Sequence, residues 1–560
     1  MVKKSVFVSF ALVFLIVSVI ATAYAKKPDN PGGDKPPKKI VDYDKDGYRS
    51  NKDCNDNDST IYPQAEEICG DGIDQNCDGA DQPCTGGPHV GLTFDGYPQN
   101  CLSCHDAEAN EMYSSTHYQW TGEAPDMVNG SGIPQGKLTN AVNSYCINIE
   151  GNWPVCGSCH VGRGKRPDAE SAGLENIDCL ACHNEEYSLA RKRLPDGSLG
   201  VETPTDSMVQ NVLAPTRANC LMCHAKAGGG DEVKRGDLSL ETIVNSDAHF
   251  DVHMYTAGSD LACQQCHVFE AHRVIGKGSD IRPTDDTARG SEVACVTCHA
   301  GKDTSGGHVD STIGRHVERV GCQSCHIPTY AKVATETYRD WRSHHDSSPA
   351  DGVSGPGHPY TVKESNLVPE YKFWNRLSDN YLLGDYASMI YDAVKDTYPT
   401  SRPLGDNQDG KLYPFKYKTA TQPKTIADGT LIALDTFEYL NVSGNVTTAI
   451  EKGLVNTGYS ASEPYEWIET DTYQMLNHGV TPSSAALQCS SCHENTARMD
   501  LPGKLGYGIK GDTGTVCTQC HDLKETKSFT STHDKHVKDK KYDCSWCHAF
   551  SRPERGLQMP

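Results

Sequence analysis

The stretch CLMCHAKAGGGDEVK, from Cys220 to Lys234, decides how this chain is organised. It begins with the pentapeptide Cys-x-x-Cys-His. Its two thiols can form thioether bonds to a porphyrin, and its histidine can give one axial nitrogen to the iron. This spacing recurs ten times along the 560 residues. A single copy could arise by chance or form half of a zinc site, but ten copies indicate covalently attached haem.

We number the ten signatures 1 to 10 along the chain and expect ten covalently bound haem c groups. In order they are Cys101, Cys104 and His105; Cys156, Cys159 and His160; Cys179, Cys182 and His183; Cys220, Cys223 and His224; Cys263, Cys266 and His267; Cys295, Cys298 and His299; Cys322, Cys325 and His326; Cys489, Cys492 and His493; Cys517, Cys520 and His521; Cys544, Cys547 and His548.

Several signatures are only about 20 to 40 residues apart, which is too short for separate domains. Neighbouring haems must therefore pack against one another. The predicted fold is a multihaem cytochrome c, in which mainly short α-helices and loops wrap a stack of covalently bound haems, with little β-structure.

The composition supports an exported electron-transfer protein without a large apolar core. Hydrophobic residues make up 37% of the chain, and the porphyrin faces would replace the missing core. The ten signatures use 20 of the 25 cysteines and leave Cys54, Cys69, Cys77, Cys84 and Cys146. The formal charge of −22 argues against nucleic acid or an anionic membrane as partner.

Residues 1–25 are predicted to be a cleaved signal peptide. Lys3 and Lys4 precede an apolar run from Val6 to Ile20, and Ala23-Tyr24-Ala25 provides a cleavage site of small residues. A retained membrane anchor is the alternative, since the apolar run is near the lower length for a span. We expect a periplasmic or extracellular, cell-surface protein that does not span a membrane once the signal is removed.

A flexible linker (26–41) is predicted to precede an Asp- and Cys-rich module (42–85) that binds Ca²⁺ within residues 42–84. Aspartates that alternate before a glycine place hard oxygens around one point, and the four cysteines of this module can form two disulfides. The module resembles a calcium-binding motif of secreted bacterial proteins, and a disordered acidic spacer is the alternative. The predicted metal ligands are Asp42, Asp44, Asp46, Asp53, Asp56, Asp58, Asp71, Asp74 and Asp78.

Residues 86–510 form the predicted octahaem domain, and residues 511–560 form an extension that carries signatures 9 and 10. Within the octahaem domain, residues 327–488 carry no signature. We expect this segment to be partly helical near Tyr381–Val394 and to wrap the haems or shape an entrance. Thirteen histidines lie outside the signatures, and most should be second axial ligands of low-potential bis-histidine haems.

Six stretches in fixed order resemble the octahaem tetrathionate reductase family of c-type cytochromes. They are CLSCHDAEANEMYSSTHYQW (101–120), NSYC (143–146), NCLMCHAKAGGGDEVKRGDL (219–238), FDVHM (250–254), VGCQSCHIPTYAK (320–332), and LQCSSCH with the later GYG (487–508). The Asp-rich module and the two-haem extension lie outside the resemblance.

The resemblance implies that the second haem, held by Cys156, Cys159 and His160, has Lys234 rather than histidine as its sixth ligand. It also places Asp231, Asn143 and Cys146 beside that haem. The distal histidines would then be His89, His117, His253, His272, His308, His316 and His478, with His533 and His536 for the extension. His249, His344, His345 and His358 would remain free.

Lys234 and Cys146 carry the chemistry that this resemblance implies. An amine ligates iron only when it is neutral, and on its flexible stem Lys234 could be displaced by substrate. A Cys146 thiolate could attack a sulfur–sulfur bond. The alternatives are a solvated loop lysine for Lys234 and a buried apolar thiol for Cys146.

Two functions follow as hypotheses. The first is a reductase of small sulfur or nitrogen compounds (tetrathionate, nitrite or hydroxylamine), with redox-partner cytochromes or quinol-linked donors supplying electrons. Its site would be Lys234, Asp231, Cys146 and Asn143. The second is a non-catalytic extracellular electron conduit, as a homo-oligomer or a filament subunit. The two added signatures and the Asp-rich module favour the second hypothesis.

Overall fold

The computed structural model describes residues 42–49, 52–55, 57–67, 73–80, 87–129, 132–138, 141–145, 152–153, 157, 159–160, 162–167, 173–194, 199–245, 247–276, 293–304, 307–309, 311–344, 357–385, 387, 391–508, 510–511, 513–521 and 528–549. Several predicted features lie outside them: the signal peptide, the linker, Asp56, Asp71, Cys69, Cys84, Cys146, Cys156 and His345. The chain forms two compact units, residues 1–83 and 84–560. No helix within the described ranges is both long enough and apolar enough to cross a membrane.

In its described part, the first unit consists of turns and bends. Cys54 and Cys77 form a disulfide. The rings of Tyr48 and Tyr62 stack with their centroids 5.4 Å apart. A disulfide and one aromatic pair are typical of a module too small to build an apolar core.

Short helices dominate the first and last parts of the second unit. The α-helices are α1 (Gln99–Leu102), α2 (Asp106–Ser114), α3 (Thr116–Gln119), α5 (Leu180–His183), α6 (Glu185–Ala190), α7 (Ser207–Gln210), α8 (Arg217–His224), α9 (Cys295–Cys298), α10 (Ser311–His316), α11 (Cys322–His326), α12 (Val446–Asn456), α13 (Cys489–His493), α14 (Thr513–Thr518) and α15 (Phe529–His533). 3-10 turns include η3 (Leu240–Val244), η4 (Cys263–Gln265) and η10 (Cys544–Trp546), and η9 (Asp534–Asp539) is a π-helix.

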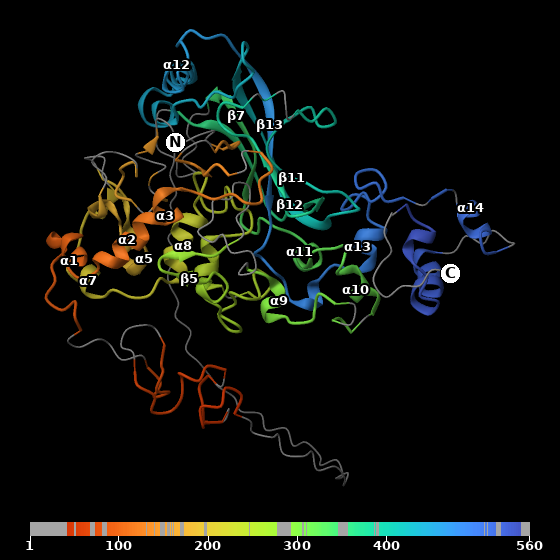
Figure 1. Ribbon diagram of the computed structural model, residues 1–560, viewed down its shortest axis with the longest axis horizontal. Coiled ribbons are helices and arrows are strands. Elements are labelled where there is room, and N and C mark those ends of the chain that lie inside the picture. Colours follow the sequence, from red (N-terminus) through yellow and green to blue (C-terminus); the bar gives the residue numbers. More distant parts are fainter. Residues whose placement is uncertain are drawn as a thin grey trace, which may run out of the picture. The chain divides into compact units, whose positions relative to one another are not determined.

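Most signatures begin in one of these short helices, as the sequence predicts. α8 shows why the chain turns helical there. The hydroxyl of Thr216 accepts from the N–H of Asn219 and the side chain of Asn219 accepts from the N–H of Thr216, which is a capping box. In Figure 1 the signature helices α5, α8, α9, α11 and α13 run in chain order along one side of a large sheet.

That sheet has seven strands and occupies the segment without signatures. Its strands are β7 (Thr335–His344), β8 (Pro359–Glu364), β9 (Glu370–Trp374), β10 (Ser378–Asn380), β11 (Tyr398–Pro403), β12 (Lys411–Thr425) and β13 (Tyr465–Met475). The order is β10-β11-β13-β12-β7-β8, and β9 also pairs with β12. β12 and β13 are antiparallel over eleven consecutive pairs, from Phe415↔Met475 to Thr425↔Tyr465. Three two-stranded ribbons complete the β-structure: β1 (Thr121–Gly122) with β2 (Gln135–Gly136), β3 (Lys192–Arg193) with β4 (Leu199–Gly200), and β5 (Phe269–Glu270) with β6 (Arg273–Val274).

One expectation for this segment was wrong, because the sheet is more β-structure than predicted. The physical reason is that both faces of β12 are buried, and one of them is polar. Lys416 and Lys418 are fully buried on the face opposite Phe415 and Tyr417. The lysines of this face alternate with aromatic residues, but lysines are usually solvated, so the pattern does not reveal a strand that is buried on both faces. Of the stretch expected to be partly helical, 381–394, Ala387 lies in a 3-10 turn, residues 386 and 388–390 lie outside the described residues, and the other described residues form bridges and turns.

The largest apolar cluster lies where α12 packs on the sheet. Ile450 and Leu454 of α12 are buried against Trp341 of β7 and Tyr439. Asn445 begins α12 by accepting from the N–H of Thr448. This core makes the sheet a rigid scaffold for the residues on its other edges.

Candidate functional site

Eight signature histidines lie in ring contact with a second histidine. The pairs are His105 with His89, His183 with His272, His224 with His117, His267 with His478, His299 with His253, His493 with His316, His521 with His536, and His548 with His533. Their centroids are 5.8–6.4 Å apart. For a ninth pair, His308 lies close enough to His326 to help lower the pKa of His326, after the larger effect of burial.

These separations fit one iron between each pair of rings. Two imidazoles on one metal have centroids about 6.2 Å apart, because each bond is about 2.0 Å long and each centroid lies about 1.1 Å behind its nitrogen. Burial also lowers the pKa of His493 and His548 to about 4 and that of His224 to about 3. These imidazoles are therefore neutral at neutral pH, the form that ligates iron.

The histidines expected to stay free are placed differently. His249 is exposed and its ring nitrogen lies 3.3 Å from the carboxylate of Asp247. His344 ends β7, and His358 lies just before β8, in the sheet segment rather than beside a signature. The distal ligands chosen from the sequence are thus the histidines that the structure brings to signature histidines.

His160 of signature 2 has different neighbours from the other nine signature histidines. Its side chain is fully buried, and neither ring nitrogen has a hydrogen-bond partner among the described residues. Trp120 stacks on it at 5.7 Å, with Tyr118 at 5.0 Å and Trp153 at 6.0 Å between centroids. No histidine ring contacts it within the part of the chain described. Buried polar atoms normally have partners, and a proximal haem ligand would use a ring nitrogen to bind iron. The surroundings of His160 therefore fit a proximal haem ligand.

Contacts between signatures give their order in space. Cys101 lies close to Cys179, Cys159 to Cys223, Cys220 to Cys263, and Cys295 to Cys322, because each thiol affects the pKa of its neighbour. Cys182 lies near Cys220, Cys266 near Cys298, Cys325 near Cys492, and Cys547 near Cys517. The rings of His493 and His533 are 6.3 Å apart. The signatures therefore follow the line 1-3-4-5-6-7-8-10-9, and signature 2 branches from signature 4.

Lys234 is held in place by its backbone. Its N–H donates to the carbonyl of Ala227 at 3.0 Å, and its carbonyl accepts from the hydroxyl of Tyr145 at 3.2 Å and from the amine of Lys416 at 3.0 Å. Gly228 has a φ of +89°, and a Cβ there would lie 3.0 Å from the Cβ of Lys234. The turn thus requires glycine, as the glycine run suggests.

Tyr145 stands among four cationic side chains. The distances from its ring centroid are 4.3 Å to Lys418 Nζ, 5.4 Å to Lys416 Nζ, 5.7 Å to Arg339 Cζ and 6.0 Å to Lys234 Nζ. Cations over an aromatic face are attracted by its quadrupole, most strongly when they are buried. Burial lowers the pKa of Lys416 well below its usual range, so Arg339 and Lys418 supply the lasting positive charge of this region, which suits the approach of an anion.

A β-bulge brings the balancing carboxylate to the same face. The register of β7 against β8 shifts between Glu336 and Tyr338, and Glu336 and Arg339 consequently share a side, 2.6 Å apart. Lys418 Nζ lies 3.2 Å from Glu336 and 2.6 Å from the carbonyl of Ser144, to which it donates. Burial would raise the pKa of Glu336, but Arg339 and Lys418 outweigh burial and lower it.

The remaining predicted site residues shape the same loops. Asn143 is buried, and its side-chain oxygen accepts from the N–H of Tyr145 at 2.8 Å, in the turn before Cys146. Both carboxylate oxygens of Asp231 are used at the start of η3, where they accept from the hydroxyl of Ser239 and the N–H of Leu240. Asp231 therefore fixes the loop that carries Lys234 to η3.

Sequence reasoning missed the residues that hold these loops to the sheet. They are Tyr145 of the loop itself and the strand residues Thr335, Glu336, Arg339, Lys416, Lys418 and Gln474. A signal was present in Lys416 and Lys418, which alternate with tyrosine and phenylalanine in the run YPFKYK. Lysines on one face of a strand are usually solvated, and only the fold reveals that this face is buried.

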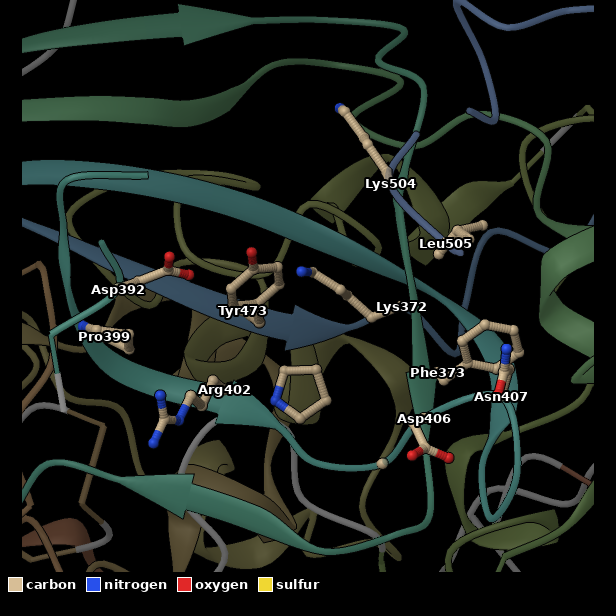
Figure 2. A pocket seen from close by; sticks show the side chains of 12 residues that line it. Lys372, Phe373, Asp392, Pro399, Arg402, Asp406, Asn407, Tyr473, Lys504 and Leu505 are labelled. Carbon is tan, nitrogen blue, oxygen red and sulfur yellow. The ribbon is translucent and has the colours of Figure 1, made fainter. Parts of the chain in front are cut away.

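A separate hollow of about 320 Å³ lies on the other face of the same strands (Figure 2). Lys372, Arg402 and Lys504 line it together with Asp392 and Tyr473, as Figure 2 shows. Tyr473 is paired with Tyr417, on the face opposite Lys416. The hollow is therefore distinct from the Lys234 site.

In the first unit, carboxylates gather as the sequence predicts for a cation site. Single oxygens of Asp42, Asp44 and Asp46 lie within 4.8 Å of one another. One buried oxygen each of Asp44, Asp46 and Asp53 has no hydrogen-bond partner among the described residues. Burial and the charges of Asp46, Asp53 and Asp42 raise the pKa of Asp44, which a bound cation would reverse. Asp58 instead accepts from the N–H and hydroxyl of Thr60.

A second loop repeats the geometry of the first. The oxygens of Asp42 accept from the N–H groups of Lys45 and Gly47, and those of Asp74 accept from the N–H groups of Asp78 and Gly79. Gly47 and Gly79 have φ of +106° and +105°. Asn76, between Asp74 and Asp78, corresponds to Asp44 and was not chosen from the sequence.

Comparisons with known proteins agree with this geometry. A family model for bacterial cytochrome c matches residues 359–496, and a model for a metal-binding motif, named for copper binding, matches residues 53–82. An uncharacterised protein of Archaeoglobus fulgidus is 29% identical, over 31% of this chain and 73% of the relative.

The crystal structure of an octahaem cytochrome c from Shewanella oneidensis is 28% identical and has a TM-score of 0.63. The match covers 79% of this chain and 100% of that chain, and it confirms the octahaem resemblance drawn from the sequence. The signatures, the paired histidines and this shared fold lead to one conclusion: the chain is a multihaem c-type cytochrome related to octahaem cytochrome c.

Proposed function

We propose that this chain is an exported decahaem c-type cytochrome that reduces a small sulfur or nitrogen compound at signature 2, with Lys234 as an exchangeable sixth ligand. The observation that carries the proposal is the difference at His160. Eight signature histidines have a second histidine ring in contact and His326 has His308 nearby, whereas the ring contacts of His160 are Tyr118, Trp120 and Trp153 and only the backbone of His117 approaches it in the described structure. One iron of the ten is therefore expected to have a weaker sixth ligand.

The residues around Lys234 suit an anionic substrate such as tetrathionate or nitrite. Haem, when bound, supplies the electrons. Lys418 and Arg339 use N–H groups on backbone carbonyls, but their two charges act through space and exceed the single charge of Glu336, whereas burial lowers the pKa of Lys416. A positive field in a buried site favours the approach of anions and opposes the protonation of a neutral amine.

The order of signatures supports an electron route to this site. The line of signatures ends at signatures 1 and 9, and electrons from either end would reach signature 2 through signature 4. Export fits covalent haem attachment and the predicted signal peptide.

A non-catalytic extracellular conduit is the second candidate, and one observation favours it. His533 of the extension contacts His493 of signature 8, so signatures 10 and 9 continue the line beyond the octahaem body. An enzyme alone does not need this addition.

Turnover with reduced viologen separates the two functions. Wild type and Lys234→His would be compared on tetrathionate, nitrite and hydroxylamine, together with EPR of the oxidised proteins. The reductase predicts one amine-ligated haem in the wild type and a loss of turnover of about a hundredfold in the variant, whose iron would be closed by imidazole. Equal and negligible rates, with ten bis-histidine signals in both proteins, would leave only the conduit.

For the first unit we propose a structural Ca²⁺ site at Asp42, Asp44, Asp46 and Asp53. The donors are carboxylate oxygens, which favour a hard cation over copper, and Cys54 and Cys77 are unavailable because they are joined in a disulfide. Calorimetric titration of the whole chain with Ca²⁺ and Cu²⁺ tests this choice; tighter Cu²⁺ binding would contradict it.

A further inference from the structure

Lys416 lies within β12, and its side chain is fully buried. Its amine nitrogen is 2.7 Å from the carbonyl oxygen of Val233, 3.0 Å from that of Lys234 and 2.5 Å from the hydroxyl of Thr335. An ammonium group has three donors, and these three acceptors use all of them. A neutral amine would accept from Thr335 instead. In either form the contacts of Lys416 go to the segment that carries Lys234 and to Thr335 of β7 rather than to a ligand.

Thr335 acts together with Lys416. Its hydroxyl is 2.6 Å from the carbonyl of Glu232 and 3.0 Å from that of Val233. The segment Glu232–Lys234 is therefore bonded through three successive carbonyls to side chains of β7 and β12. These bonds fix the backbone of Lys234. Its side-chain nitrogen lies 6.0 Å from the centroid of the Tyr145 ring.

We propose that Lys416 is a positioning residue for Lys234. By holding the carbonyls of Val233 and Lys234 against β12, it sets where the Lys234 amine can reach and so determines how firmly that amine closes the signature 2 iron. This inference rests on the proposed function, because the ligand role of Lys234 is itself proposed.

Lys418 has the same relation to the other loop. It is two residues further along the same face of β12 and donates to the carbonyl of Ser144 at 2.6 Å. Residues i and i+2 of a strand are about 6.6 Å apart. One rigid strand therefore fixes the spacing between the loop that carries Lys234 and the loop 143–145.

The test replaces Lys416 with methionine, which has a similar volume and no donor, in the complete haem-loaded chain. In Lys416→Met we expect the EPR and near-infrared signals of the amine-ligated haem to shift or split. We also expect exogenous imidazole to bind this haem about tenfold more readily, since a small displacement of a positioned group costs one to two orders of magnitude. The bis-histidine signals should not change.

Lys424→Met is the matched control. Lys424 lies on the same strand and the same face, but it is paired with Glu466 of β13. Lys424→Met should lower the thermal stability without shifting the EPR signal of the signature 2 haem. If Lys416→Met does not fold, Thr335→Val removes only the hydroxyl that Lys416 contacts and should shift the same signal by a smaller amount.

The outcomes separate the two proposals. An amine-ligated signal that is present in wild type, lost in Lys234→His and unmoved in folded Lys416→Met would overturn the positioning role alone. A wild type without any amine-ligated haem would overturn the proposed function and this inference together.

Discussion

The hydroxyl of Tyr145 lies 3.2 Å from the backbone carbonyl oxygen of Lys234 and donates to it, which joins the two loops of the candidate site. The same hydroxyl is 3.0 Å from the side-chain oxygen of Gln474 on β13. Tyr145 is almost completely buried, at 1% exposed. A single phenol therefore ties both loops to the sheet.

Replacing Tyr145 with phenylalanine removes this tie without changing the packing. We expect the stability to fall by about 1–2 kcal/mol, because the carbonyl of Lys234 and the side-chain oxygen of Gln474 lose the one buried hydrogen that they share, although Lys416 still bonds the carbonyl of Lys234. The signal of the signature 2 haem should broaden as the loop gains freedom. Thermal denaturation and EPR measure the two effects.

Tyr417→Phe is the control for this prediction. The Tyr417 hydroxyl donates to Asp471 at 3.0 Å on the opposite face of the sheet. Tyr417→Phe should lower the free energy of unfolding by a similar amount and leave the signature 2 haem signal unchanged. If the signature 2 haem signal is the same in Tyr145→Phe as in Tyr417→Phe, the link between Tyr145 and Lys234 is contradicted.

Acid should weaken the sheet through Glu336. Its pKa is lowered in the folded chain, so it stabilises the fold fully above the ordinary value of 4.5, and this stabilisation is lost as pH falls through the lowered pKa. Glu336→Gln leaves Arg339 and Lys418 buried without a counter-charge and should cost about 3–5 kcal/mol near neutral pH. Melting curves should show the gap between wild type and variant narrowing as pH falls below 4.5.

Glu466→Gln is the matched change at an exposed pair. Its partner Lys424 lies on the same strand as Lys418, and the carboxylate is 53% exposed. We expect a loss of less than about 1 kcal/mol with little dependence on pH. If the stability difference between wild type and Glu336→Gln does not change with pH, Glu336 is not charged in the folded protein.

The variant His533→Ala tests the predicted sixth ligand of the signature 10 haem in the extension. If His533 is the sixth ligand of signature 10, the variant should gain one high-spin haem, and added imidazole should restore the low-spin state. Absorbance and EPR report both changes. His249→Ala provides the comparison, because His249 is exposed and paired with Asp247, and it should leave every haem low-spin.

Calcium removal should affect only the first unit. Chelation, or Asp44→Asn, should expose residues 42–80 to protease, while the haem spectra stay constant. Asp58→Asn should have no effect on Ca²⁺ binding, because Asp58 is not one of the described carboxylates whose oxygens gather within 4.8 Å of one another. Equal sensitivity of Asp44→Asn and Asp58→Asn would argue for a diffuse acidic surface in place of a site.

The sequence predicts the helical part of this fold well, because each signature carries its own local geometry. Cys220 and Cys223 must lie on one helical turn for both to reach one porphyrin, and α8 provides it. The histidines chosen as distal ligands lie beside signature histidines, but their bonding to iron stays a prediction. Lys234 likewise stays a predicted ligand, although its loop and that of Asn143 meet at Tyr145.

The sheet could not be predicted, because its decisive face buries charge. Lys416, Lys418 and Glu336 would each be assigned to the surface from their type alone. Lys416 and Lys418 bond carbonyls that come from loops 182 to 274 residues away in the sequence, and no local pattern records such partners.

The side position of signature 2 has a consequence for how one molecule could serve both proposed roles. If signature 2 is the reacting centre, current between the two ends of the line of signatures passes signature 4 without crossing it. Slow or inhibited turnover at signature 2 would then leave this throughput intact, so the two-signature extension is compatible with the proposed catalysis.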